Sequence, residues 1–147
     1  MNPGIYALLE RIHGHLAMLG LAVLLHPVIT LGRGRLGVGG RWSVGILAGI
    51  LAVASAMGWW LYGEYRASVK PALVRHRLDV ALAFEVKEHL AYLCLVLAIC
   101  GAAALLAAPG HPPTLRLARR MLGLAWVLGL AVAVLGLLVS ASAAPGW

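Results

Sequence analysis

Hydrophobic residues form four long, nearly continuous runs along this chain, separated by short polar stretches. The runs lie at about residues 5–31, 43–65, 79–108 and 114–142. Crossing the hydrocarbon core of a bilayer as an α-helix takes about twenty apolar residues, and each run reaches that length. Runs without polar alternation predict helices rather than the strands of a membrane barrel. We therefore predict an all-α integral membrane protein with a single four-span transmembrane domain, residues 1–147.

The connections between the runs indicate how the spans are arranged. Residues 32–42 and 109–113 are short connections, which favour antiparallel neighbours and hence an up-down-up-down bundle. Ser43 and Thr114 are expected as N-caps of the second and fourth spans. The longer connection, residues 66–78, contains Pro71, which fits the first turn of a short helix at the membrane interface.

Small residues are expected where the predicted spans touch, because they let helix backbones approach closely in lipid. Gly45 and Gly49 form a GxxxG pattern in the second span. The fourth span offers three further glycines, Gly123, Gly129 and Gly136.

Composition supports membrane insertion and argues against nucleic acid as a partner. The chain is 62% hydrophobic and only 12% charged, whereas soluble domains carry about 25% charged residues. Its net charge is +7, but lysine and arginine in a membrane protein serve as topology signals and headgroup anchors. Glu10 and Arg11 interrupt the first apolar run, so we do not expect a secretory signal peptide.

Charges divide unequally between the two predicted membrane faces. All the acids fall on the face that holds the N-terminus, namely Glu10, Glu64, Asp79, Glu85 and Glu88. The opposite face carries bases close to the span ends, namely Arg33, Arg35, Arg41, Arg116, Arg119 and Arg120. Equally many bases lie on the N-terminal face, so their number alone does not decide the orientation. Because the opposite face has no counter-charges, we expect it to be cytoplasmic. The N-terminus would then be periplasmic or external to an inner (plasma) membrane.

The first predicted span carries three histidines, His13, His15 and His26. Ionisable residues at membrane depth are rare and indicate function, and imidazole is a common ligand of haem iron. His15 and His26 are eleven positions apart, which brings them within about 20° on a helix, whereas His13 points elsewhere. His89, near the start of the third span, would lie within about 5 Å of the depth of His15.

These positions predict a b-type haem whose iron is bound by His15 and His89. Glu85, one turn before His89, is expected to accept the second ring N–H and fix the tautomer. His26 is a possible further ligand without an evident partner in the chain. Two explanations need no cofactor. His26 would form a hydrogen bond with the helix carbonyl that Pro27 leaves without its usual partner. His89 would contact the lipid headgroups at the membrane boundary. Aromatic residues are expected beside the haem or a quinone ring, namely Tyr92, Trp59 and Trp60.

The general plan, a small bundle of four spans with imidazoles facing inward, is similar to that of membrane b-type cytochromes and cytochrome-b-like anchor subunits. The similarity implies electron transport by a subunit of a respiratory or redox complex, with quinone or a periplasmic redox protein as partner. A chain this short leaves little room for a substrate pocket. An electron carrier is therefore expected rather than a stand-alone enzyme.

Two alternatives remain open from the sequence. Four-helix bundles hold non-haem metal with Glu-x-x-His pairs and further glutamates. Glu10 and His13 form such a pair on the N-terminal face, where three more glutamates could contribute, namely Glu64, Glu85 and Glu88. The second alternative is a non-catalytic accessory subunit, in which the polar residues contact helices of a partner.

Overall fold

The computed structural model describes residues 3–33, 37–107 and 110–142, and every regular element in these ranges is a helix. Four helices are long and apolar enough to cross a membrane, namely α1 (Pro3–Gly32), α2 (Val38–Glu64), α4 (Leu78–Ala107) and α5 (Pro112–Ser142). The prediction of an all-helical chain with four such helices is confirmed. Arg35, Ala108 and the residue after it, Pro109, lie outside the described residues.

Both predicted N-caps are wrong, because the helices begin earlier than the apolar runs. Gly37 is the N-cap of α2, and Ser43 lies inside the helix, where its hydroxyl donates to the Gly39 carbonyl at 2.9 Å. In α5 the His111 carbonyl already accepts a hydrogen bond from Leu115 N–H at 3.0 Å. Continuing the helix satisfies more backbone groups than a side-chain cap would at the later position.

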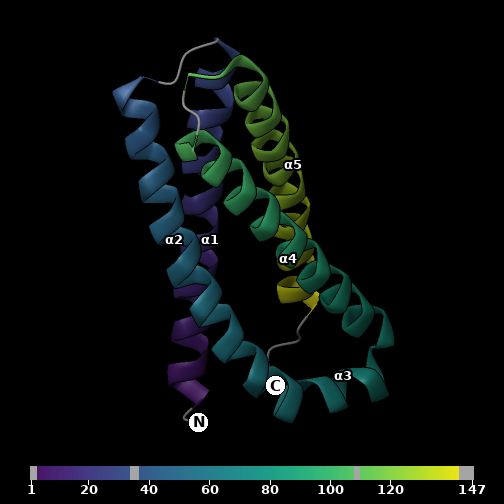
Figure 1. Cartoon of the computed structure of the whole chain (residues 1–147). Coiled ribbons are helices and arrows are strands. Elements are labelled where there is room, and N and C mark those ends of the chain that lie inside the picture. The colour runs from purple at the N-terminus through teal and green to yellow at the C-terminus, as the bar shows by residue number, and fades with distance from the viewer. Residues whose placement is uncertain (1–2, 34–36, 108–109, 143–147) are drawn as a thin grey trace.

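A short helical corner joins α2 to α4. It consists of the π-helical turn η1 (Tyr65–Val69) and the helix α3 (Lys70–His76), which lie across one end of the molecule in Figure 1. Pro71 lies in the first turn of α3, as predicted. At the other end, Arg77 N–H donates to the Leu73 carbonyl at 2.7 Å, and α4 begins at the next residue.

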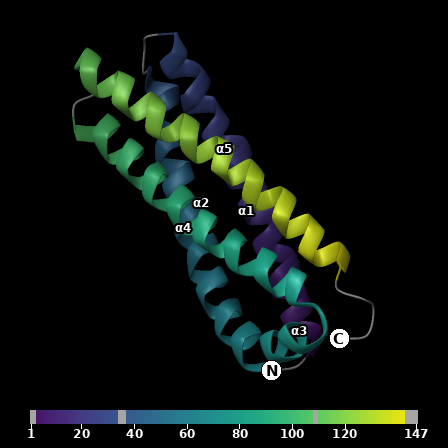
Figure 2. The same ribbon diagram turned by 90° about the vertical axis from the view of Figure 1, so that its right-hand side faces the viewer.

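The long helices pack as two pairs, α1 with α2 and α4 with α5, and α5 also lies against α1 (Figures 1 and 2). The contact between α2 and α4 is sparse. Among the described residues, no Cα of α1 lies within 8 Å of a Cα of α4. Leu24, Leu47, Leu105 and Leu122 belong to the main buried cluster, which therefore draws on all four long helices.

Helix contacts use some of the expected glycines and not others. A Cβ on Gly45, Gly49 or Gly123 would meet nothing within 4 Å, so the expectation that these three mediate packing is wrong within this chain. Gly129 does lie at a contact, since its Cβ would come 2.8 Å from Leu21 Cδ1. Gly20 likewise faces Ile50 at 3.2 Å. A GxxxG spacing places both glycines on one face of their helix, but it does not determine which neighbouring helix packs against that face.

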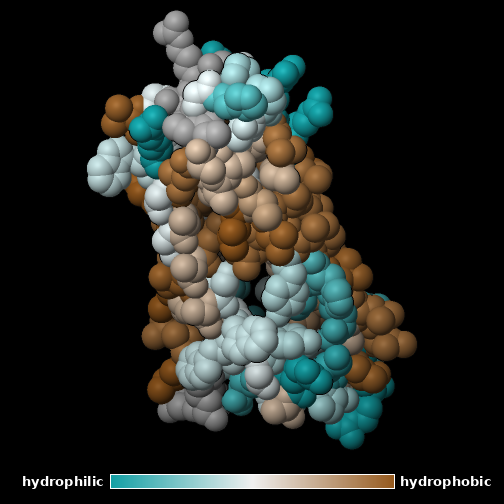
Figure 3. All heavy atoms as spheres, in the orientation of Figure 1, coloured by the Kyte–Doolittle hydropathy of each residue, from teal (hydrophilic) through white to brown (hydrophobic). Residues whose placement is uncertain are grey.

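The molecular surface is apolar over much of its length. Figure 3 shows hydrophobic residues over the upper middle of the molecule and hydrophilic residues gathered towards both ends. In the same view a hollow opens between the lower parts of α2 and α4, above α3, and pale to hydrophilic residues surround it. Here α2 and α4 diverge (Figure 1).

Candidate functional site

His13 is the histidine of α1 that faces the inside of the bundle. It lies within about 20° of the buried Leu24 on the helix. Its Nδ1 donates to the Ala54 carbonyl of α2 at 3.1 Å. The absence of a side chain on Gly58 makes room for the ring, because a Cβ there would lie 3.0 Å from His13 Cε1. His13 therefore ties α1 to α2.

His15 faces the outside of the bundle. It is about 180° from Leu24 on α1, and its side chain is exposed. Its Nδ1 lies 2.7 Å from the Arg11 carbonyl oxygen, one turn earlier on the same helix. A carbonyl oxygen only accepts hydrogen bonds, so Nδ1 carries the proton. In the neutral ring, Nε2 then keeps its lone pair and points away from the helix backbone.

His89 repeats this arrangement on α4. It is exposed, about 180° from the buried Ala98, and its Nδ1 donates to the Glu85 carbonyl at 2.7 Å. The expected bond to the Glu85 carboxylate is not formed. That carboxylate instead accepts a 2.7 Å hydrogen bond from Lys70 Nζ of α3. The carbonyl one turn back lies within direct reach of a helical histidine, whereas the glutamate side chain reaches towards the nearest cation.

The structure does not bring His15 and His89 together. Each lies on the face of its helix opposite to the buried residues, and within the described ranges no Cα of one helix comes within 8 Å of a Cα of the other. Both nevertheless share one arrangement, with Nδ1 bonded to a main-chain carbonyl and the side chain exposed.

His26 has a side-chain partner from the neighbouring helix. Its Nδ1 lies 2.6 Å from Ser43 Oγ of α2, and the same hydroxyl lies 2.9 Å from the Gly39 carbonyl. When the Ser43 hydroxyl donates its proton to the Gly39 carbonyl, its oxygen accepts a hydrogen bond from His26 Nδ1–H. Nε2 of His26 then keeps the lone pair, as in His15 and His89. His26 shares the exposed face of α1 with His15, as the spacing predicted.

Two charged side chains of α4 are largely buried. Lys87 and Glu88 form a 2.7 Å ion pair, with side chains only 16% and 20% exposed. Lys87 Nζ also lies 4.4 Å from the centre of the Phe84 ring. Lys87 was not predicted as a site residue; its position next to Val86 at the start of the third apolar run was the available signal.

The non-haem alternative has no assembled site. Among the described residues, no three side chains of histidine, cysteine, aspartate or glutamate lie close enough to hold a metal ion. Two of the candidate carboxylates, on Glu85 and Glu88, pair with lysines. The candidate aromatic residues lie on the outer surface, with exposed fractions of 73% for Trp59, 54% for Trp60 and 46% for Tyr92.

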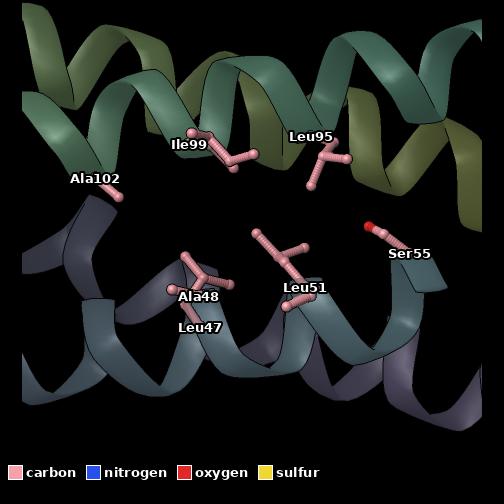
Figure 4. A pocket seen from close by; sticks show the side chains of 9 residues that line it. Leu47, Ala48, Leu51, Ser55, Leu95, Ile99 and Ala102 are labelled. Carbon is pink, nitrogen blue, oxygen red and sulfur yellow. The ribbon is translucent and has the colours of Figure 1, made fainter.

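A small apolar pocket lies between α2 and α4. Figure 4 shows Leu47, Leu51 and Ser55 of α2 facing Leu95 and Ile99 of α4 across it. Its volume is about 200 Å³, below the 300–1,000 Å³ typical of ligand sites. None of the candidate ligands lines it.

Comparisons of the chain with models of known protein families, with curated proteins and with solved structures gave no significant match.

Proposed function

We propose that this chain is a membrane-embedded electron-transfer subunit that binds b-type haem through His15 and His89. The observation that carries the proposal is their common arrangement. Both rings donate Nδ1–H to a carbonyl one turn earlier, which leaves Nε2 without a main-chain bond, and both residues are exposed. A bonded Nδ1 fixes the tautomer and orients Nε2 as a ligand, as second-shell hydrogen bonds do for metal-bound histidines.

The donor set favours haem over a non-haem metal. A porphyrin supplies the in-plane ligands of its iron, so the protein need add only one or two axial groups. Isolated histidines can meet that requirement. A non-haem ion needs several protein ligands at one place, and no such group occurs in the described part of the chain.

The position of the two histidines favours an assembly. His15 and His89 lie on outward faces of two helices whose Cα atoms, within the described ranges, stay more than 8 Å apart. We therefore propose that another chain, either a second copy or a different membrane subunit, supplies the second axial ligand at each face. His26, exposed on the same face as His15, is a further candidate ligand in this arrangement.

Membrane insertion and topology complete the proposal. We infer that α1, α2, α4 and α5 cross an inner (plasma) membrane in up-down-up-down order, with the N-terminus external or periplasmic. The lengths and apolar composition of the helices support insertion, and the short connections support the order. Electrons would pass to quinone or to a redox protein on the N-terminal side.

Absorption spectroscopy of the purified, haemin-supplemented protein tests the function. We expect a Soret band and sharp α-bands after dithionite reduction. The variants His15→Ala and His89→Ala should each remove at least about half of the bound haem, because each deletes an axial ligand. Two variants serve as controls. His111→Ala changes a histidine bonded to Thr114 at the opposite end, and Glu85→Gln leaves the main-chain bond of His89 in place. Both should retain the spectrum.

The absence of a Soret band from a fully helical sample would reject haem binding. That result would favour the accessory-subunit alternative, in which the exposed histidines contact a partner. Equal loss of haem in His111→Ala and His89→Ala would reject the ligand assignment.

A further inference from the structure

A groove between α1 and α5 is lined by three arginines at the end of the molecule opposite to the acids. Arg116, Arg119 and Arg120 line it together with the apolar residues Val28 and Leu124 and with Gly123. The groove has a volume of about 530 Å³. The three arginines lie at spacings of three and four along α5, so they share one side of the helix.

The positive charge of this groove has no counterpart in the described residues. None of its arginines forms an ion pair there, since the ion pairs use Lys70, Arg77 and Lys87. The acids that form these pairs all belong to α4, near the corner with α3. Guanidinium groups without acidic partners are suited to bind an anion from outside the chain.

Arg119 is held at the groove by its packing on α1. Its Nη2 lies 3.4 Å from the position that a Cβ of Gly32 would occupy, so the guanidinium covers the last residue of α1. The C-terminus of a helix carries partial negative charge, which favours a cation there. The glycine leaves the space that this contact needs, and Arg119 bridges α5 to α1.

We propose that this groove binds the phosphate headgroup of an anionic phospholipid. Arginine forms paired, charge-assisted hydrogen bonds with phosphate oxygens. The arginines lie in the first three turns of a 31-residue helix, which is longer than the roughly 20 residues that span a bilayer core. They are therefore placed at headgroup level, while Val28 and Leu124 extend the groove towards the acyl chains. The inference rests on the proposed membrane insertion and is independent of haem.

Native mass spectrometry of the full chain released from detergent micelles tests this site with phosphatidylglycerol as the probe. The variant Arg116→Gln/Arg120→Gln removes two groove arginines and leaves Arg119 in its contact with Gly32. Arg33→Gln/Arg41→Gln removes the same charge from exposed positions at the same end, outside the groove. We expect phosphatidylglycerol to bind the groove variant at least about tenfold more weakly, and the control variant within about twofold of the parent.

Two further measurements identify the ligand. Phosphatidylcholine, which has no net charge, should bind the parent and the groove variant equally. Inorganic phosphate should displace phosphatidylglycerol only at a large molar excess, because it lacks the acyl chains that contact the apolar part of the groove. Equal weakening by both double variants, or displacement by phosphate at equimolar concentration, would overturn the proposal. Membrane insertion is tested separately by reconstitution of the protein into phosphatidylcholine nanodiscs. A protein that does not insert is therefore distinguished from one that inserts but does not bind phosphatidylglycerol at the groove.

Discussion

Tyr65 buries a hydroxyl group at the corner between α2 and α3. The residue is 4% exposed and belongs to a second buried cluster with Leu73, Val80 and Ala81. Its ring stacks on Phe84, with 3.8 Å between the centroids. The hydroxyl oxygen has no hydrogen-bond partner among the described residues. Burying such a group without a partner costs about 1–3 kcal/mol.

Replacing Tyr65 by phenylalanine should therefore stabilise the protein. The substitution keeps the ring stacking and removes the unpaired hydroxyl, so we expect the free energy of unfolding to rise by about 1 kcal/mol or more. Unfolding by sodium dodecyl sulfate in bicelles, followed by circular dichroism, measures this change. Tyr92→Phe is the matched control, because Tyr92 is 46% exposed and should show little change. A less stable Tyr65→Phe variant would mean that the hydroxyl is bonded.

The histidines show which features of single residues the sequence predicts and which it does not. The helix period correctly separated His13 from His15 and His26. It could not decide which side faces inward, because α1 is apolar on all sides and a uniform helix has no hydrophobic face to orient it. The expectation that the imidazoles of His15 and His89 face inward is therefore wrong, because both are exposed, whereas His13, which was expected to point elsewhere, faces α2.

At the scale of elements, Gly101 sets how closely α4 and α5 approach. A Cβ at this position would lie 2.8 Å from Leu122 Cγ and 3.3 Å from Met121 Cβ. Leu122 is fully buried, so it has little room to move. The two helices form the most extensive contact of the molecule, and Cys94 Sγ donates across it to the Ala125 carbonyl at 3.1 Å.

Gly101→Ala should destabilise the α4–α5 hairpin by about 1–3 kcal/mol, the usual cost of overpacking a filled interior. The same detergent unfolding experiment measures the loss. Gly49→Ala provides the control, because a Cβ on Gly49 meets nothing within 4 Å and alanine is the better helix former. If Gly49→Ala were the more damaging substitution, the GxxxG face of α2 would have to pack against another chain.

The elements themselves were largely predictable, because helix formation in apolar surroundings depends on the chain's own hydrogen bonds. Hydropathy predicted the four long helices, and Pro71 predicted the start of α3. The π-helical turn η1 was not predicted, since no residue pattern in Tyr65–Val69 distinguishes it from an α-helix. The contact of α5 with α1 was also beyond reach, because packing in lipid depends on local shape rather than on hydrophobicity.

At the scale of the whole molecule, the end of α1 and the start of α2 lie at the same end as the connection between α4 and α5 (Figure 1). The start of α1 and the short helix α3 lie at the opposite end, where acids and bases form ion pairs. Charge is therefore distributed unequally between the two ends of the molecule. One end carries arginines that form no ion pair among the described residues. This asymmetry makes a prediction about sidedness.

Cysteine labelling in intact cells should place the two ends on opposite sides of the membrane. In a Cys94→Ser/Cys100→Ser background, Arg75→Cys should react with a membrane-impermeant maleimide, because we propose that α3 lies on the external side. Arg41→Cys and Gly110→Cys, both exposed at the other end, should react only after the membrane is permeabilised, since arginine-rich connections are retained in the cytoplasm. Labelling in detergent controls for the reactivity of each thiol. Reaction of Arg41→Cys without Gly110→Cys would contradict the up-down-up-down order, whereas reaction of both without Arg75→Cys would reverse the orientation and preserve that order.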